Sequence, residues 1–191
     1  MRVVAGTLRG RKIEAPAGRS TRPTTDRMRE SIASMLLSAQ GLDLDGASIL
    51  DAFAGSGAMG IELISRGARH CAFCERDRKA ASIVRGNCKS LGLASDAFAV
   101  VGGDVLKRAG TGLPGAPFTI VFLDPPYAMD ATVVAGLVRT LWETDQLAPR
   151  ALVVYERSDG SPQMELDFAE FLRTKAHGGT CIDMYRIGDG Q

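Results

Sequence analysis

Two short segments of the sequence carry residues whose types and spacing could do chemistry. The first, Asp51–Gly60, contains a G-x-G-x-x-G loop that follows an apolar run and precedes a helical pattern. Glycines at these places allow a tight turn and let a ligand approach the backbone. Glu75 follows Gly55 by 20 residues, where an acidic side chain can accept hydrogen bonds from both ribose hydroxyls. This segment predicts a site for an adenosine-containing cofactor.

Asp51 separates two classes of cofactor. A carboxylate just ahead of the loop would repel a pyrophosphate but attract the ammonium or sulfonium of S-adenosylmethionine. In nicotinamide enzymes the first glycine directly follows the strand, and a pyrophosphate sits on the helix N-terminus. Here Asp51 and three more residues precede Gly55. We therefore favour S-adenosylmethionine, with a nicotinamide-dependent oxidoreductase as an alternative.

The second segment is Asp124-Pro125-Pro126-Tyr127, which follows an apolar run. Two prolines provide carbonyl acceptors but no N–H donors, so beside the Asp124 carboxylate they form a cluster suited to a planar NH2 group. Tyr127 can stack on an aromatic ring. The segment predicts a site that holds an exocyclic amine for attack on a methyl group. A nicotinamide enzyme would leave it without a role.

The elements that must position both segments alternate between strand and helix patterns. Buried strands separated by helices predict an α/β fold, with a mostly parallel central sheet and helices on both faces. The carboxyl ends of such strands form a ligand crevice, so both segments should open into it. We expect strands at 48–53, 71–74, 98–101, 118–123, 151–155 and 180–187, and helices from Thr24 or Thr25 through Leu36 and at 58–65, 77–91, 131–142 and 166–172.

The charge of the chain is uneven along its length. Residues 1–30 hold eight basic and three acidic side chains, whereas the remaining residues hold 15 basic and 19 acidic ones. A basic arm rich in arginine favours a nucleic-acid partner, and a solvated arm without a partner is the alternative. We expect residues 1–23 to form a small β-hairpin and loop, and residues 24–191 to form the main domain.

The composition of the chain excludes several classes of protein. The chain is 45% hydrophobic and 24% charged, which is typical of globular proteins. It has no apolar run long enough to span a membrane and opens without an apolar signal core, so we expect a cytoplasmic protein, without a membrane partner and as a monomer. Cys71 and Cys74 form a single C-x-x-C in a strand-like run. We expect buried thiols and no metal site.

The two segments together resemble the Rossmann-like S-adenosylmethionine-dependent methyltransferases that modify exocyclic nitrogens of nucleic-acid bases. The N-terminus narrows the resemblance. Arg2–Lys12 and Arg22–Glu30 are similar to the opening of the bacterial 16S ribosomal RNA guanine-N2 methyltransferase family. The similarity runs from Arg2 to Ile187 and implies a methyltransferase domain preceded by a small hairpin.

The resemblance implies roles for individual residues on the cofactor side. Asp51, Gly55, Ser56 and Gly57 would line the methionine part of S-adenosylmethionine, and Glu75 would hold its ribose. Asp104 would contact the adenine amine, although an acid before Val105 could also simply cap a helix.

On the substrate side the same resemblance implies catalytic roles. Asp124 and the Pro125 carbonyl would orient the guanine amine, and Tyr127 would stack on the base. Glu156, just past the fifth strand, is expected to be a surface acid, with a place in the site as the alternative. Substrate-binding positions implied by the family pattern are Arg9, Arg11, Arg22, Thr24, Arg27 and Pro126. The resemblance also implies that the N-terminal segment flanks the cofactor pocket and contacts RNA, and this segment carries Arg22, Thr24, Asp26, Arg27 and Arg29.

The resemblance implies an enzyme that methylates N2 of one guanine in 16S ribosomal RNA, within the small ribosomal subunit. Two alternatives stay open. An adenine-N6 methyltransferase of DNA or RNA would use the same two segments. A non-enzymatic RNA-binding protein would explain the basic arm alone.

Overall fold

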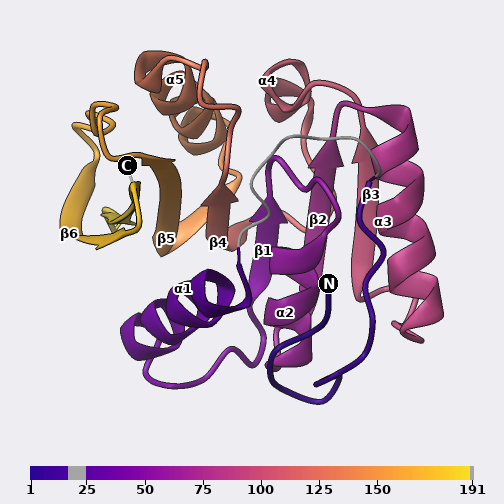
Figure 1. The fold of residues 1–191 in the computed structure, drawn as a ribbon. Coiled ribbons are helices and arrows are strands. Elements are labelled where there is room, and N and C mark those ends of the chain that lie inside the picture. The colour runs from indigo at the N-terminus through magenta and orange to yellow at the C-terminus, as the bar shows by residue number, and fades with distance from the viewer. Residues whose placement is uncertain (17–24, 190–191) are drawn as a thin grey trace.

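The computed structural model describes residues 1–16 and 25–189. Seven strands form one sheet in the order β3-β2-β1-β4-β5-β7-β6 (Figure 1). The helices are α1 (Asp26–Ala39), α2 (Ala58–Ser65), α3 (Arg78–Ser90), α4 (Val105–Arg108), the 3-10 turn η1 (Ala109–Thr111) and α5 (Ala131–Glu143). The strands are β1 (Ser48–Asp51), β2 (His70–Glu75), β3 (Phe98–Gly102), β4 (Phe118–Leu123), β5 (Leu147–Ser158), β6 (Ala169–His177) and β7 (Thr180–Ile187).

Strands β1 to β5 are parallel, and β7 and β6 extend the sheet in antiparallel pairs. The strand order reverses between β3 and β4. Strands β1, β2 and β3 run in order toward one edge of the sheet, and β4 then pairs with the other side of β1. Ligands bind at such a switch point, beyond the carboxyl ends of the strands. The predicted α/β fold with a mostly parallel sheet is confirmed.

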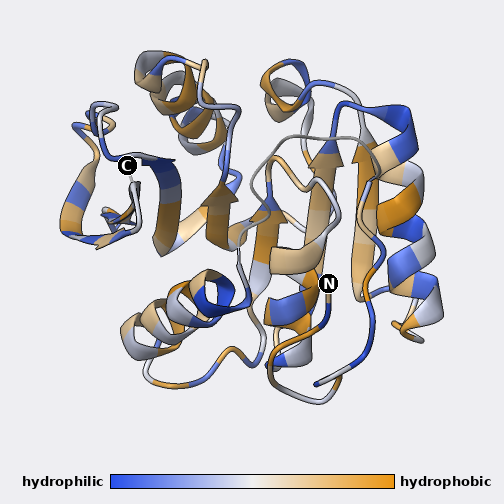
Figure 2. Cartoon of the chain, in the orientation of Figure 1, coloured by the Kyte–Doolittle hydropathy of each residue, from blue (hydrophilic) through white to orange (hydrophobic). Residues whose placement is uncertain are grey.

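Helices cover both faces of the sheet, and each face has its own apolar core. One core joins α1, α2 and α3 to the sheet, and the other joins α4 and α5 to it. The central strands are hydrophobic along most of their length (Figure 2), as strands buried on both faces must be. Successive strand residues therefore point alternately into the two cores.

Local sequence signals explain where several helices begin. The Thr25 hydroxyl accepts a hydrogen bond from the Met28 N–H at the start of α1, and Asp77 and Asp130 cap α3 and α5 in the same way. Such caps satisfy N–H groups that have no partner within the helix. The predicted helix at 58–65 has the same bounds as α2, and the predicted strand at 118–123 the same bounds as β4.

The N-terminal segment lies against α2. An antiparallel bridge joins Arg2 to Lys12. The Glu62 carboxylate on α2 accepts hydrogen bonds from the N–H groups of Val4 and Ala5, at 2.7 Å and 3.0 Å. Glu62 is fully buried, so these bonds form without competition from water. They hold the segment at the side of the sheet where the cavity described below opens.

The helix predicted at 166–172 is wrong, because residues 169–177 form strand β6. Gly178 and Gly179 both have positive φ, 56° and 84°, which suits a two-residue hairpin turn. This turn joins β6 to β7, and the two strands pair with each other over most of their length. The residues of β6 include good helix formers, so tertiary pairing overrides their local preference.

Candidate active site

A cavity of about 780 Å³ opens beyond the carboxyl ends of β1, β2, β3, β4 and β5. This size is typical of pockets that bury a small-molecule ligand. Its walls come from both predicted segments, because Gly55, Glu75 and Asp104 line it together with Asp124 and Tyr127. The fold therefore joins the glycine loop and the Asp-Pro-Pro-Tyr segment in one site.

The Glu75 carboxylate ties two loops together at the end of β2. Its Oε2 accepts a hydrogen bond from the Gly55 N–H at 2.8 Å, and its Oε1 accepts one from the Asp77 N–H at 2.7 Å. Glu75 is only 6% exposed, so its carboxylate has a fixed orientation. Each carboxylate oxygen has a further lone pair, and the side chain can also accept hydrogen bonds from ribose hydroxyls.

Glycine at two positions lets α2 lie close to the sheet. A Cβ on Gly60 would overlap Phe73 Cε1, and one on Gly57 would lie 3.0 Å from Val84 Cγ1. Gly57 also has a φ of 78°. Gly55 and Ser56 line the cavity, whereas Gly57 lies behind them against Phe73 and Val84.

Asp51 ends β1 with a buried carboxyl group, 1% exposed. Its Oδ2 accepts a hydrogen bond from the Gly60 N–H at 3.1 Å. Burial raises the pKa of Asp51 to about 7, the Gly60 N–H opposes this rise, and the charges of Asp124 and Glu75 add to it. A bound cation would favour the ionised form. Asp51 therefore suits the positively charged end of S-adenosylmethionine.

Asp104 is placed for both of the roles expected of it, a contact to the cofactor and a helix cap. It lines the cavity, and its Oδ1 accepts a hydrogen bond from the Leu106 N–H at 3.1 Å as the N-cap of α4. Helix α4 was absent from the predicted elements, although Asp104 before Val105 was its signal. Capping holds the carboxylate at the end of β3, on the side of the cavity next to Glu75.

The Asp124–Tyr127 segment leaves the end of β4 and lines the cavity with all four residues. Asp124 is half-buried and Pro125 is buried. The Pro126 carbonyl accepts a hydrogen bond from the Met129 N–H at 2.8 Å, which stabilises the turn. Tyr127 is 55% exposed, so its ring is open to a stacking partner at the cavity mouth.

Of the predicted substrate-binding arginines, the three that the structure describes do not line the cavity. Arg9, Arg11 and Arg27 are exposed, and Arg11 donates a hydrogen bond from Nη2 to the Ser90 carbonyl at 3.0 Å. Arg22 and Thr24 lie outside the described residues. The described arginines of the predicted set thus belong to the outer surface and not to the cavity wall.

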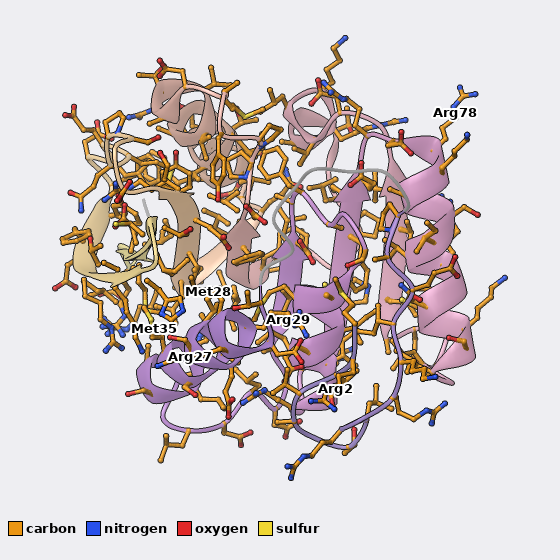
Figure 3. The ribbon with its side chains drawn as sticks, in the orientation of Figure 1. Arg2, Arg27, Met28, Arg29, Met35 and Arg78 are labelled. Atoms are coloured by element: carbon orange, nitrogen blue, oxygen red, sulfur yellow. The ribbon has the colours of Figure 1, made fainter. Side chains whose placement is uncertain are left out.

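Arg29 belongs to the segment that was expected to flank the cofactor pocket, and it lines the cavity. It is only 1% exposed, and its Nη2 donates hydrogen bonds to the Arg2 carbonyl at 2.7 Å and to Asp26 Oδ1 at 2.8 Å. Figure 3 shows Arg29 on the side of α1 toward Arg2, apart from Arg27. The helical stripe 29, 32, 33 and 36 is buried, and this spacing indicates which face of α1 Arg29 occupies.

The expectation that Glu156 is a surface acid is wrong. Glu156 is 6% exposed and lines the cavity. Strand β5 continues past Tyr155 to Ser158, and β7 pairs with it up to Ser158. The pairing with β7 covers Glu156, and no pattern within β5 itself shows that β7 lies beside it.

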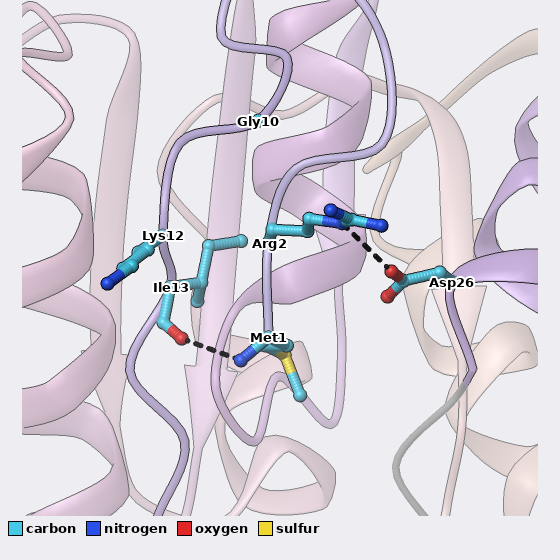
Figure 4. Close-up of a pocket in the computed structure, with 6 residues that line it drawn as sticks. All are labelled: Met1, Arg2, Gly10, Lys12, Ile13 and Asp26. Atoms are coloured by element: carbon cyan, nitrogen blue, oxygen red, sulfur yellow. Dashed lines mark hydrogen bonds and ion pairs between the residues drawn. The ribbon is translucent and has the colours of Figure 1, made fainter.

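A second pocket, of about 510 Å³, lies on the N-terminal segment (Figure 4). Arg2 Nε lies 3.5 Å from Asp26 Oδ2, and the Met1 ammonium donates a hydrogen bond to the Ile13 carbonyl at 3.2 Å. The Lys12 side chain points away from Asp26 in Figure 4. The pocket therefore lies between the Arg2–Lys12 bridge and the first turn of α1.

Within residues 1–16 and 25–189, no group of three or more His, Cys, Asp or Glu side chains is placed to hold a metal ion. Over the same part of the chain, no helix combines the length and apolar character that crossing a membrane requires. Cys71 and Cys74 lie buried in β2 as free thiols.

Comparison with known proteins matches nearly the whole chain. The family model described as "Conserved hypothetical protein 95" matches residues 1–186. "Putative rRNA methyltransferase YlbH" of Bacillus subtilis is 45% identical, over 97% of this chain and 98% of that protein. "Ribosomal RNA small subunit methyltransferase D" of Haemophilus influenzae is 30% identical, over 97% of this chain and 93% of that protein.

Solved structures agree with this match. "Putative methyltransferase yhhF" from Escherichia coli has a TM-score of 0.81 at 31% identity, covering 100% of this chain and 99% of that one. The rRNA methyltransferase aviRa from Streptomyces viridochromogenes has a TM-score of 0.66 at 17% identity, covering 93% and 90%, and at that identity it supports the fold alone. The predicted family resemblance is confirmed: the chain belongs to the Conserved hypothetical protein 95 family, together with the ribosomal RNA methyltransferases that it resembles.

Proposed function

We propose that this protein transfers a methyl group from S-adenosylmethionine to the exocyclic N2 amine of one guanine in 16S ribosomal RNA, within the small ribosomal subunit. The names of its relatives support a ribosomal RNA methyltransferase. The observation that carries the proposal is the joining of Asp124–Tyr127 to the glycine loop and Glu75 in one cavity. An acceptor cluster beside a cofactor site is what an amine methyltransferase needs.

The cavity then has two halves with different tasks. The cofactor half comprises Asp51–Gly60, Glu75 and Asp104, and the base half comprises Asp124–Tyr127, Glu156 and Arg29. In the cofactor half, Asp51 would face the methionine ammonium or the sulfonium, Glu75 the ribose, and Asp104 the adenine amine. When bound, S-adenosylmethionine supplies an electrophilic methyl group on its sulfonium.

In the base half, the protein would orient the guanine amine, which is a weak nucleophile, for attack. The lone pair of the guanine amine is delocalised into the ring, and acceptors at its two hydrogens favour a pyramidal nitrogen. Asp124 and the Pro125 carbonyl would supply these acceptors, while Tyr127 stacks on the base. When the amine takes up the methyl group, Asp124 or water would accept the proton that the nitrogen loses.

Positioning supplies much of the rate in this scheme. Holding the reacting atoms in a near-attack geometry contributes about 7–11 kcal/mol. Asp124 need not be a strong base, because the methylated nitrogen is acidic before it loses its proton. A paired base must leave its helix to reach the cavity, whereas an exposed loop base is reached with less free energy.

The N-terminal segment completes the proposal. Residues 1–23 would form an RNA-contacting extension and residues 24–191 the methyltransferase domain. Arg9, Arg11 and Arg27 are exposed, and guanidinium groups suit phosphate contacts. We infer that they hold ribosomal RNA while the target base enters the cavity, with Arg22 and Thr24 in the same role.

The test uses S-adenosylmethionine with a labelled methyl group. It is offered with unmodified small subunits, naked 16S RNA or duplex DNA, and the labelled nucleoside is identified after digestion. We expect N2-methylguanosine from small subunits and its loss in Asp124→Ala, with the exposed Asp159→Asn as the matched control. Label in N6-methyladenine would replace the proposed substrate, and cofactor binding without any label would favour an RNA-binding role.

A further inference from the structure

Glu156 is a buried acid that the reaction as described above does not use. It lies near the end of β5, is 6% exposed and lines the cavity. A carboxylate on the wall of a cavity can accept hydrogen bonds from a ligand that enters it. Its place in the site therefore indicates which part of a bound base it meets.

The register of the sheet puts Glu156 beside Asp124. Leu123 of β4 pairs with Tyr155 of the parallel strand β5. The residue after Leu123 is Asp124, just past the end of β4, and the residue after Tyr155 is Glu156, still within β5. The two acids therefore start from neighbouring backbone segments, and neighbouring strands lie about 4.8 Å apart.

Glu156 points to the face of the sheet on which α1 and α2 pack. Phe122 and Val154 pack in the core beneath α1 and α2, while Leu123 and Tyr155 pack in the core on the opposite face. Because side chains alternate along a strand, Glu156 returns to the side of Val154, and Asp124, which follows the end of β4, lines the same cavity. Arg29 of α1 also lines this cavity.

The chemistry of this pair distinguishes the two purines. Guanine carries an N1–H donor next to its N2 amine, so two ionised carboxylates can accept from both. Adenine carries an acceptor at N1 next to its N6 amine, and an ionised carboxylate only accepts. A carboxylate beside Asp124 thus matches guanine and leaves adenine with two acceptors facing each other, which is unfavourable.

We propose that Glu156 accepts a hydrogen bond from N1–H of the target guanine and so selects guanine over adenine. This inference rests on the proposed function and adds to it a specificity residue. Asp124 and the Pro125 carbonyl hold the amine that reacts, and Glu156 holds the neighbouring ring nitrogen. The two contacts together fix the base in its plane.

The test replaces the target guanine, once mapped, by 2,6-diaminopurine in RNA assembled into small subunits. This base keeps the N2 amine but has an acceptor at N1. We expect the wild-type protein to methylate guanine about 10- to 100-fold faster than diaminopurine. In Glu156→Gln the ratio should fall to within about threefold, because an amide can either accept or donate.

Two further variants separate recognition from folding. Glu156→Asp keeps the carboxylate and should keep the preference for guanine at a lower rate, while the exposed Glu170→Gln on β6 should match wild type in both. An unchanged ratio in Glu156→Gln, with both rates lowered equally, would overturn the inference and leave the proposed function intact. Absence of N2-methylguanosine with the wild-type protein would overturn both.

Discussion

The two halves of the cavity are built in different ways. In the cofactor half, residues close in sequence bond to one another, as Asp51 does to Gly60 and Glu75 does to Asp77. In the base half, Asp124, Glu156 and Arg29 come from β4, β5 and α1, far apart in the chain. A cofactor site can therefore be recognised from short motifs, whereas a base site depends on which elements become neighbours.

Asp124→Ala should have the largest effect. It removes an acceptor from the reacting amine, and we expect kcat to fall by about 100- to 1,000-fold. The affinity for S-adenosylhomocysteine should stay within about threefold of wild type, since Asp124 lies in the base half. Steady-state kinetics and titration calorimetry measure the two quantities. An equal loss in both would show that the halves are not separate.

Glu75→Gln tests the other half. One carboxylate oxygen becomes an NH2 group that faces the backbone N–H donor of Gly55 or Asp77, so the loop geometry is lost with the ribose contact. We expect the affinity for S-adenosylhomocysteine to fall by about 10- to 100-fold. At saturating cofactor, kcat should stay within about threefold, and the exposed Glu165→Gln serves as control. A fall in kcat as large as the fall in affinity would contradict the division.

The pH dependence of stability reports on Asp51. Burial raises its pKa from 3.8 to about 7, so the folded protein without cofactor holds this proton more tightly than the unfolded chain. The contribution of Asp51 to the free energy of unfolding is therefore greatest below pH 3.8 and falls as pH rises to about 7.

Between pH 5 and pH 8 this fall amounts to about 2–3 kcal/mol. Asp51→Asn should flatten it and weaken cofactor binding, because the amide carries no charge for the ammonium or sulfonium. Urea unfolding of both proteins at the two pH values measures the effect. Identical slopes for wild type and variant would show that Asp51 titrates normally.

Gly60→Ala tests whether the cofactor half depends on the close packing of α2 against β2. The new methyl group would overlap Phe73 Cε1 and lie 2.6 Å from Cys71 Sγ, so α2 must move away from β2. We expect a loss of about 1–3 kcal/mol in the free energy of unfolding and weaker cofactor binding.

Gly86→Ala in α3 is the matched control for this substitution. No atom lies within 4 Å of its added Cβ, and alanine should stabilise the helix by about 0.5–1 kcal/mol. Urea denaturation measures both variants. A neutral Gly60→Ala would mean that α2 can shift freely on the sheet.

Prediction from the sequence was accurate where a signal is local. The bounds of α2 and β4 agree with the structure, because a glycine loop, a proline pair and apolar runs mark their ends. It was wrong for residues 166–172, where helix-forming side chains belong to an edge strand paired with β7. Pairing of that kind depends on a partner strand and on two glycines with positive φ.

The sequence by itself determined the family, the α/β class and the two segments that meet in the cavity, because each is encoded by neighbouring residues and their spacing. The tertiary structure alone decided that Glu156 is buried beside Asp124 and that Arg29 reaches the same cavity. These placements follow from strand register and from the packing of α1 on the sheet. In the sequence, a charged residue that will be buried looks the same as one that will stay exposed. The two differ only when the elements that cover the buried residue are in place.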